Sequence, residues 1–130
     1  MEDRQDEHKK QREQAAFWLG YSQQLSNTIR YAEALQAAER AVALDETNAE
    51  GWYVRGTCLA MLARYDEALA DFEHALTLNP SYVAAWDGKA WVLGIKGHKA
   101  EALAAINRAL ELDPEYFEAQ KRKKRLQAME

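Results

Sequence analysis

The sequence predicts an all-α protein built from repeated antiparallel helix pairs, and three observations support this prediction. Alanine (24) and leucine (14) far outnumber valine and isoleucine (7 together), and alanine and leucine favour helices whereas β-branched residues favour strands. The two prolines, Pro80 and Pro114, lie 34 positions apart. A 34-residue period then aligns three blocks without a gap, at residues 15–48, 49–82 and 83–116.

The same residue types recur at fixed places in the three blocks. The matching rows are Trp18/Trp52/Trp86, Leu25/Leu59/Leu93, Leu35/Leu69/Leu103, Ala41/Ala75/Ala109 and Leu44/Leu78/Leu112. So many matches in one ungapped register do not arise by chance, so each block is one structural repeat.

Each block contains two apolar stripes at helical spacing. In the middle block, Trp52, Gly56 and Leu59 follow an i, i+4, i+7 pattern, and a second stripe begins at Ala68 and continues to Phe72. The pairs Asn79-Pro80 and Asp113-Pro114 end helices, because the residue before proline avoids the helical region. The expected helices are 15–27, 31–44, 49–62, 65–78, 83–96 and 99–112.

The middle block resembles the tetratricopeptide repeat (TPR) family. It contains W-x(3)-G-x(2)-L from Trp52 to Leu59, then A-x(3)-F-x(2)-A from Ala68 to Ala75, and Pro80; the 34-residue period is also the one expected for this family. The first block departs from this pattern at Ser22, Ala38 and Glu46, and the third at Ala90 and Ile106. The resemblance covers about four-fifths of the chain. It implies a right-handed superhelical solenoid of antiparallel helix pairs with seven helices.

The two ends of the chain differ in charge. Residues 117–130 (FEAQKRKKRLQAME) begin like a fourth block, and we expect one basic capping helix whose Phe117, Leu126 and Met129 cover the third repeat. This segment has 5 basic and 2 acidic residues, whereas the three repeats have 8 and 14. Residues 1–14 are charged and balanced, and they form either an extension of the first helix or a disordered leader.

Several classes of function are disfavoured by composition and motifs. The formal net charge of −4 argues against nucleic-acid binding, and the longest apolar run, residues 58–63, is too short to span a membrane. The start of the chain is too charged for a secretory signal, so we expect a cytoplasmic protein. The single cysteine, Cys58, is interpreted as a small buried hydrophobe, and His8, His74 and His98 do not converge. We therefore expect no enzyme, with no catalytic residues, no metal site and no cofactor.

The resemblance implies that the first helix of each pair lines a concave groove in which a partner protein binds. Carried over by alignment, the expected partner-binding residues are Leu19, Gln23, Tyr53, Thr57, Met61, Asp87, Trp91, Ile95, Lys121 and Arg125. Trp91 has no tryptophan at its equivalent positions, so it is either a binding hot spot or a residue that packs near Leu126. The lining suggests an adaptor that binds a peptide or helix with an apolar anchor, and with an acidic group near Lys121 and Arg125.

Three further expectations concern partners. TPR co-chaperones that hold the C-terminal carboxylates of heat-shock chaperones use lysine, asparagine and arginine along the groove, so the lining here argues against partners of that type. The alternative function is self-association through the groove or the end helix, which makes a homo-oligomer possible. Arg55 and Lys89 stand where the family usually has leucine, and they either tune the groove or lie at a half-exposed edge.

Overall fold

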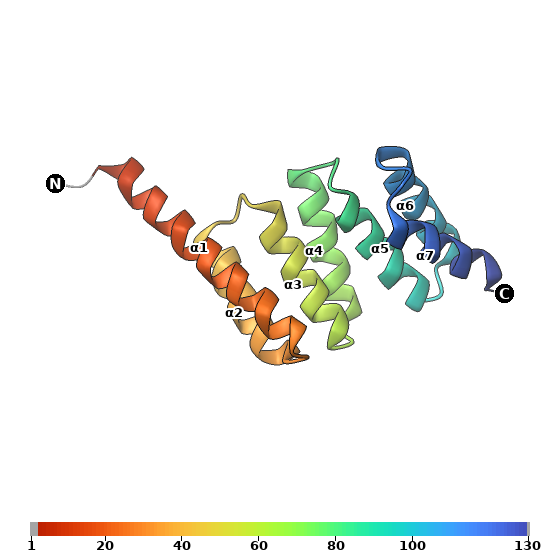
Figure 1. Ribbon diagram of the computed structural model, residues 1–130, viewed down its shortest axis with the longest axis horizontal. Helices are drawn as coiled ribbons and strands as arrows, with labels where there is room; N and C mark the ends of the chain where they lie inside the picture. Colours follow the sequence, from red (N-terminus) through yellow and green to blue (C-terminus); the bar gives the residue numbers. More distant parts are fainter. Residues whose placement is uncertain (1–2, 130) are drawn as a thin grey trace.

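The computed structural model describes residues 3–129, and this part of the chain contains seven α-helices and no strand (Figure 1). The helices are α1 (Arg4–Asn27), α2 (Tyr31–Leu44), α3 (Ala49–Met61), α4 (Tyr65–Leu78), α5 (Val83–Ile95), α6 (Lys99–Leu112) and α7 (Phe117–Ala128). The bounds expected for α2, α4 and α6 are confirmed. Helices α3 and α5 each end one residue earlier than expected.

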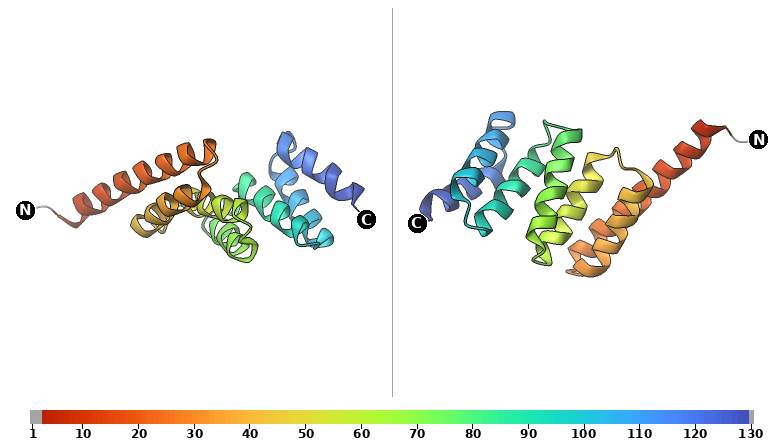
Figure 2. Two further views of the ribbon diagram at one scale, coloured as in Figure 1. Left: turned by 90° about the horizontal axis from the view of Figure 1, so that it is seen from below. Right: turned by 180° about the vertical axis from the view of Figure 1, so that it is seen from behind.

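Consecutive helices pack as three antiparallel pairs, α1 with α2, α3 with α4, and α5 with α6. Each second helix also contacts the first helix of the next pair, and α7 packs on α5 and α6. The first helices α1, α3, α5 and α7 contact one another in chain order, so they form one continuous layer (Figure 2). The prediction of an all-α solenoid is confirmed.

The turn inside each pair has the same backbone conformation in all three repeats. Ile29, Ala63 and Gly97 have φ values of 62°, 61° and 83°. These residues lie 34 positions apart, so the period found in the sequence is also a period of the backbone. Only glycine adopts this left-handed region without strain, so the first two turns hold a side chain in an unfavourable conformation.

The connection between pairs also repeats. Asp45, Asn79 and Asp113 each follow a second helix, and in each case the side-chain Oδ1 accepts a hydrogen bond of 3.1 Å from the backbone N–H two residues later. These are Asx turns, which reverse the chain and start the next pair. Proline is therefore dispensable in this turn, which explains why the first block keeps the period with Glu46 in its place.

Phe72 joins the second repeat to the third. Its ring is fully buried, and it lies against glycines of two different first helices, Gly56 of α3 and Gly88 of α5. A Cβ atom at Gly88 would lie 2.9 Å from two ring carbons. Glycine at position 88 is thus the residue that lets α4 and α5 approach closely.

Helix α7 keeps one hydrogen bond that recurs in the repeats, but its outer surface differs from theirs. The indole Nε1 atoms of Trp52 and Trp86 donate to the carbonyl oxygens six residues earlier, each at 2.9 Å. In α7, Gln120 occupies the tryptophan position, and its Nε2 donates to the Pro114 carbonyl at 2.7 Å. The three α7 positions that correspond to Trp52, Gly56 and Leu59 are polar and exposed: Gln120, Lys124 and Gln127. Helix α7 therefore presents a polar outer surface at this end of the solenoid.

The charged N-terminal segment is helical from Arg4 onwards. The Asp3 side chain caps α1 by accepting a hydrogen bond of 2.9 Å from the Asp6 N–H. Residues 4–14 are exposed, and in Figure 2 this part of α1, in red, extends beyond the body of the fold. Of the two alternatives for the N-terminal segment, the structure has the extension of the first helix, while residues 1–2 and 130 lie outside the described part.

Candidate functional site

Two pockets lie along the layer of first helices, one near each end. The pocket between α1 and α3 has a volume of about 150 Å³ and is lined by Gln23, Ser26, Asn27, Tyr53, Val54 and Thr57. The pocket between α5 and α7 has a volume of about 220 Å³ and is lined by Ala90, Trp91, Gly94, Ile95, Arg122, Arg125, Leu126 and Met129. Most of the expected groove residues therefore gather at these two places.

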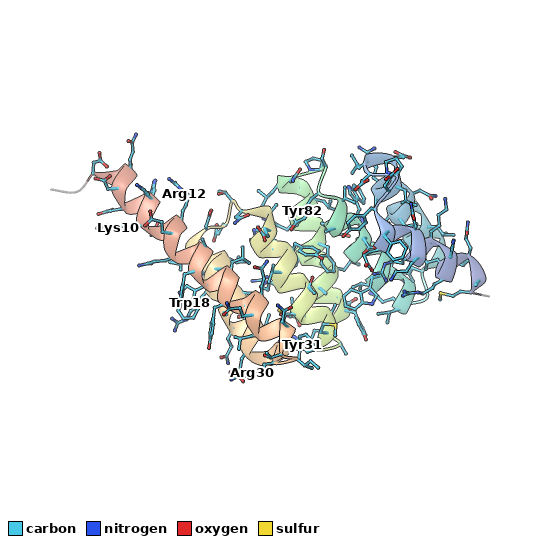
Figure 3. The ribbon with its side chains drawn as sticks, viewed as in Figure 1. Lys10, Arg12, Trp18, Arg30, Tyr31 and Tyr82 are labelled. Carbon is cyan, nitrogen blue, oxygen red and sulfur yellow. The ribbon has the colours of Figure 1, made fainter. Side chains whose placement is uncertain are left out.

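Tyr53, which lines the α1–α3 pocket, packs against two other aromatic rings. The ring centroid of Tyr53 lies 5.2 Å from that of Tyr82 and 5.8 Å from that of Phe72. Tyr82 lies at the junction of α4 and α5 (Figure 3). Burial raises the pKa of the Tyr53 and Tyr82 hydroxyls, so both rings stay neutral at physiological pH. Thr57 donates a hydrogen bond to the Tyr53 carbonyl at 3.0 Å.

A bidentate ion pair connects α5 to α7 beneath the groove surface. Arg122 donates from Nε to Asp87 Oδ1 at 2.6 Å and from Nη2 to Oδ2 at 3.2 Å. The guanidinium of Arg122 also lies 5.9 Å from the centroid of the Trp91 ring, within reach of a cation–π interaction. Asp87 is only 7% exposed, so its assignment to the partner-contacting surface is corrected, because its carboxylate is occupied by Arg122.

The sequence interpretation did not assign a role to Arg122. The repeat alignment nevertheless marks Arg122 as unusual. The equivalent residues one and two repeats earlier are Gly88 and Val54, and both are buried. A charged side chain at a position that is otherwise buried requires a charged partner. Asp87, itself unusual in a row that begins with Leu19 and Tyr53, is that partner.

Leu19 is also corrected as a groove residue. It is 6% exposed and belongs to the core cluster that also contains Val54 and Cys58, so it offers almost no surface to a ligand. Gln23, the next expected residue on α1, is exposed and donates from Nε2 to Glu50 Oε1 at 3.0 Å.

Trp91 packs near Leu126, which was one of the two roles considered for it, and its role as a binding hot spot stays a prediction. It is half-buried and packs against the main core cluster, yet it also lines the α5–α7 pocket together with Leu126. Leu126 is buried, and a Cβ atom at Gly94 would lie 3.0 Å from its Cδ2 atom, so α5 and α7 are in close contact here. Ile95 in this pocket and Met61 near the end of α3 are both exposed apolar side chains.

The basic end of the groove contains Lys121 and Arg125. Lys121 Nζ lies 3.9 Å from Glu118 on the same helix and 4.7 Å from the centroid of the Phe117 ring. Arg125 is exposed at the edge of the α5–α7 pocket. Arg125 therefore borders the apolar lining of that pocket, and Lys121 lies one helical turn earlier on α7.

Arg55 and Lys89 lie on the side of α3 and α5 that faces the second helices. Arg55 donates to both carboxylate oxygens of the buried Asp71 in α4, at 2.7 and 2.9 Å, and lies 4.9 Å from the Trp52 centroid. Lys89 lies 5.5 Å from the Trp86 centroid and 3.9 Å from Glu73. Of the two alternatives for these residues, the half-exposed edge agrees with this placement.

Other chemistry is not supported by the described residues. Within residues 3–129, no group of three or more His, Cys, Asp and Glu side chains is placed to hold a metal ion. Cys58 is buried as expected, 3.6 Å from Ser26 Oγ, and burial raises the pKa of its thiol. In the same range no helix is long and apolar enough to cross a membrane.

Comparison with known proteins agrees with this architecture. Tetratricopeptide repeat family models match residues 49–82 and residues 83–116. The chain belongs to the tetratricopeptide repeat family. The TPR fold supports a role in protein–protein interaction. No curated protein matches the chain.

Solved TPR domains share the fold at low sequence identity. The first TPR of Spaghetti (RPAP3) bound to the HSP90 peptide SRMEEVD is 22% identical, with a TM-score of 0.85 over 89% of this chain and 92% of that one. The Arabidopsis OM64 TPR domain is 20% identical, with a TM-score of 0.86 over 92% and 99%. The TPR2B domain of yeast Sti1 in complex with pHsp70 is 22% identical, with a TM-score of 0.83 over 88% and 96%.

Proposed function

We propose that this TPR chain is an adaptor that binds a peptide or helix of a partner protein along its first helices, with an apolar anchor in the α5–α7 pocket. The observation that carries the proposal is the composition of this pocket. Trp91, Ile95 and Met129 give it an apolar lining, and Arg125 stands at its edge. Interfaces are dominated by such aromatic anchors surrounded by polar groups.

The charges next to the pocket favour an acidic group in the ligand. Arg122 is engaged by Asp87, so Arg125 and Lys121 are the cations that face a ligand at this end. A carboxylate two or three residues from the apolar anchor would be close to both. Electrostatic complementarity of this kind contributes mainly to specificity and association rate.

We also propose that the groove does not hold a chaperone C-terminus through a two-carboxylate clamp. The similarity to RPAP3 and Sti1 domains does not support this exclusion, and at 20–23% identity it shows the fold alone. What supports it is the wall formed by α1 and α3, where Leu19 is buried and Gln23 is bonded to an acidic residue, Glu50. No lysine or arginine stands at the groove positions of these two helices.

The proposal is tested by selecting a binding peptide from a displayed peptide library and measuring its dissociation constant for variants. Trp91→Ala is expected to weaken binding by about tenfold, as loss of an anchor worth about 1–2 kcal/mol. The double variant Lys121→Ala/Arg125→Ala is expected to weaken it as well. The matched control Lys123→Ala/Lys124→Ala removes the same charge from the same helix and should change binding less than twofold.

Two outcomes would contradict the proposal. One is a loss of less than twofold in both groove variants while their circular dichroism spectra match that of the wild type. The other is an equal loss in the Lys123/Lys124 control, which would indicate general charge attraction. For the chaperone exclusion, the HSP90 peptide SRMEEVD should bind no better than the same peptide with an amidated C-terminus.

A further inference from the structure

One face of α1 exposes positions that are buried in the other repeats. Three residues of α1 align with positions that are buried one and two repeats later in the chain: Phe17, Gly20 and Gln24. Those buried residues are Gly51, Val54 and Cys58 in α3, and Ala85, Gly88 and Val92 in α5. They contact the preceding pair: Gly51 lies against Val42 of α2, and Gly88 lies against Phe72 of α4. The α1 face is therefore in the position of a repeat interface that has no partner.

The centre of this face is apolar, Gln24 at its border is polar, and Tyr21 extends from the face to a pocket between α1 and α2. Phe17 is 64% exposed and Tyr21 is 41% exposed, and their rings stack with centroids 6.4 Å apart. Gly20 lies between them, and a Cβ atom placed there would meet nothing within 4 Å. We call Ala16, Phe17, Gly20 and Tyr21 the α1 face. Terminal repeats normally carry a polar outer surface, as α7 does here, and the α1 face does not.

The chain that directly precedes the α1 face leads away from it. Between α2 and α3, residues 45–48 form a turn that places the second helix against the next first helix. The equivalent residues 11–14 are helical, and α1 continues without a break to Arg4. Arg4 therefore lies about 16 Å beyond Ala15 along the helix axis. Figure 3 shows Lys10 and Arg12 on this overhanging part.

We propose that the α1 face is covered by the α1 face of a second copy of this chain, in an antiparallel pair with its two-fold axis between residues 18 and 19. In this register Phe17 lies over Gly20 of the second copy, and Tyr21 lies over Ala16 of the second copy. Each contact occurs twice, as a two-fold interface requires. The same kind of contact occurs inside the solenoid, where the ring of Phe72 packs against the helical glycine Gly88.

Charges at the borders of the α1 face agree with this arrangement. Glu13 would come opposite Gln24 of the second copy, a pair able to form a hydrogen bond. Lys9 would lie along the last turns of the second copy's α1, whereas Arg12 lies against residues 43–47 of its own chain. A helix C-terminus carries partial negative charge, and the last turn of α1 has no basic residue. Lys9 of one overhang would therefore complement the helix end of the other copy.

A head-to-tail arrangement lacks comparable support. The exposed surface of α7 that would meet the α1 face is polar, with Gln120, Lys124 and Gln127. Burying Lys124 and Gln127 against Phe17 and Tyr21 would separate their polar groups from water, at a cost in free energy. The symmetric contact also differs from self-association through the groove or the end helix, because it leaves the α5–α7 pocket open.

The first test is the mass of the full chain in sedimentation equilibrium as its concentration rises. The mass is expected to increase from 14.8 kDa towards twice this value, and Phe17→Glu/Tyr21→Glu should weaken association at least tenfold. Phe117→Glu is the matched control, since Phe117 is 62% exposed at the other end of the molecule, and it should leave association unchanged. A mass that stays at 14.8 kDa up to about 1 mM, the range of very weak complexes, would overturn the proposal. Equal weakening by the Phe117 control, or association that persists in the Phe17/Tyr21 variant, would do the same.

The second test addresses the register with single cysteines. Glu13→Cys mixed with Gln24→Cys should form a disulfide-linked dimer under mild oxidation, because these positions face each other across the axis. Gln24→Cys alone should not, since its two copies would be about 16 Å apart along the helices, beyond the span of a disulfide. Cys58 is buried and does not compete. Cross-linking of Gln24→Cys alone at an equal rate would overturn the register.

Discussion

Gly88→Ala tests whether the close contact between α4 and α5 sets the packing of the second repeat on the third. Position 88 is in the interior of α5, so alanine would gain about 1 kcal/mol of helix propensity relative to glycine. Its Cβ atom would lie 2.9 Å from Cε1 and Cζ of Phe72, whose ring is fully buried. Overpacking of this kind costs about 1–3 kcal/mol. The net expectation is therefore a loss of up to about 2 kcal/mol in the free energy of unfolding.

Gly20→Ala is the matched control, because Gly20 occupies the same repeat position in α1 as Gly88 does in α5, and a Cβ atom there meets nothing within 4 Å. It should gain about 1 kcal/mol from helix propensity alone. Urea unfolding followed by circular dichroism, at a concentration too low for association, measures both variants. The difference between them isolates the steric cost, and in a Phe72→Leu background Gly88→Ala should cost less. If Gly88→Ala is as stable as Gly20→Ala, the steric argument is refuted.

Three further predictions follow from the turns and buried groups. Ile29→Gly should raise the free energy of unfolding by about 1 kcal/mol, because Ile29 is exposed and has a positive φ of 62°. Gly97→Ala should lower the free energy of unfolding, because Gly97 also has a positive φ. A change of the same sign in both variants would contradict the strain argument. Arg55→Ala should lower the free energy of unfolding by about 1–3 kcal/mol, because it leaves the buried carboxylate of Asp71 unpaired. Asp71→Ala should lower it less, because the arginine that remains reaches water. Equal losses in the two variants would contradict this reasoning. Burial raises the pKa of Tyr82, so above pH 10 the unfolded state loses this proton first, and the free energy of unfolding should fall as the pH rises. Tyr82→Phe should make that fall shallower, and an unchanged slope would show that Tyr82 is not responsible.

The 34-residue period predicted the fold because the repeat extends to the backbone. Trp52, Trp86 and the Asx turns at Asp45, Asn79 and Asp113 use local contacts, within six residues along the chain. Local contacts leave a periodic trace in the sequence, which is why the helix bounds agreed to within one residue after α1. The start of α1 was not predictable, because residues 4–14 bury no apolar face that could reveal helical spacing.

The groove was predicted less well, because its details depend on contacts between helices far apart in the sequence. The Asp87–Arg122 pair joins residues 35 positions apart, so a comparison between repeats shows only that Arg122 stands where Gly88 and Val54 stand, and does not show which residue pairs with it. Leu19 has the register of an exposed row and is nevertheless buried in the core cluster that contains Val54. Register along one helix identifies the face on which a residue lies, whereas exposure depends on how closely the neighbouring helix approaches.

The replacement of tryptophan by Gln120 has a consequence for how such a protein can change its length. Because Gln120 keeps the hydrogen bond to the Pro114 carbonyl, α7 docks on the third repeat as a first helix would, while only its outer surface is different. Duplication of one whole repeat upstream of α7 would therefore give a longer solenoid with the same cap still in place. Growth beyond α7 would instead require apolar residues at Gln120, Lys124 and Gln127. The number of repeats in this architecture can thus increase by insertion within the chain, and the polar outer surface of α7 needs almost no change.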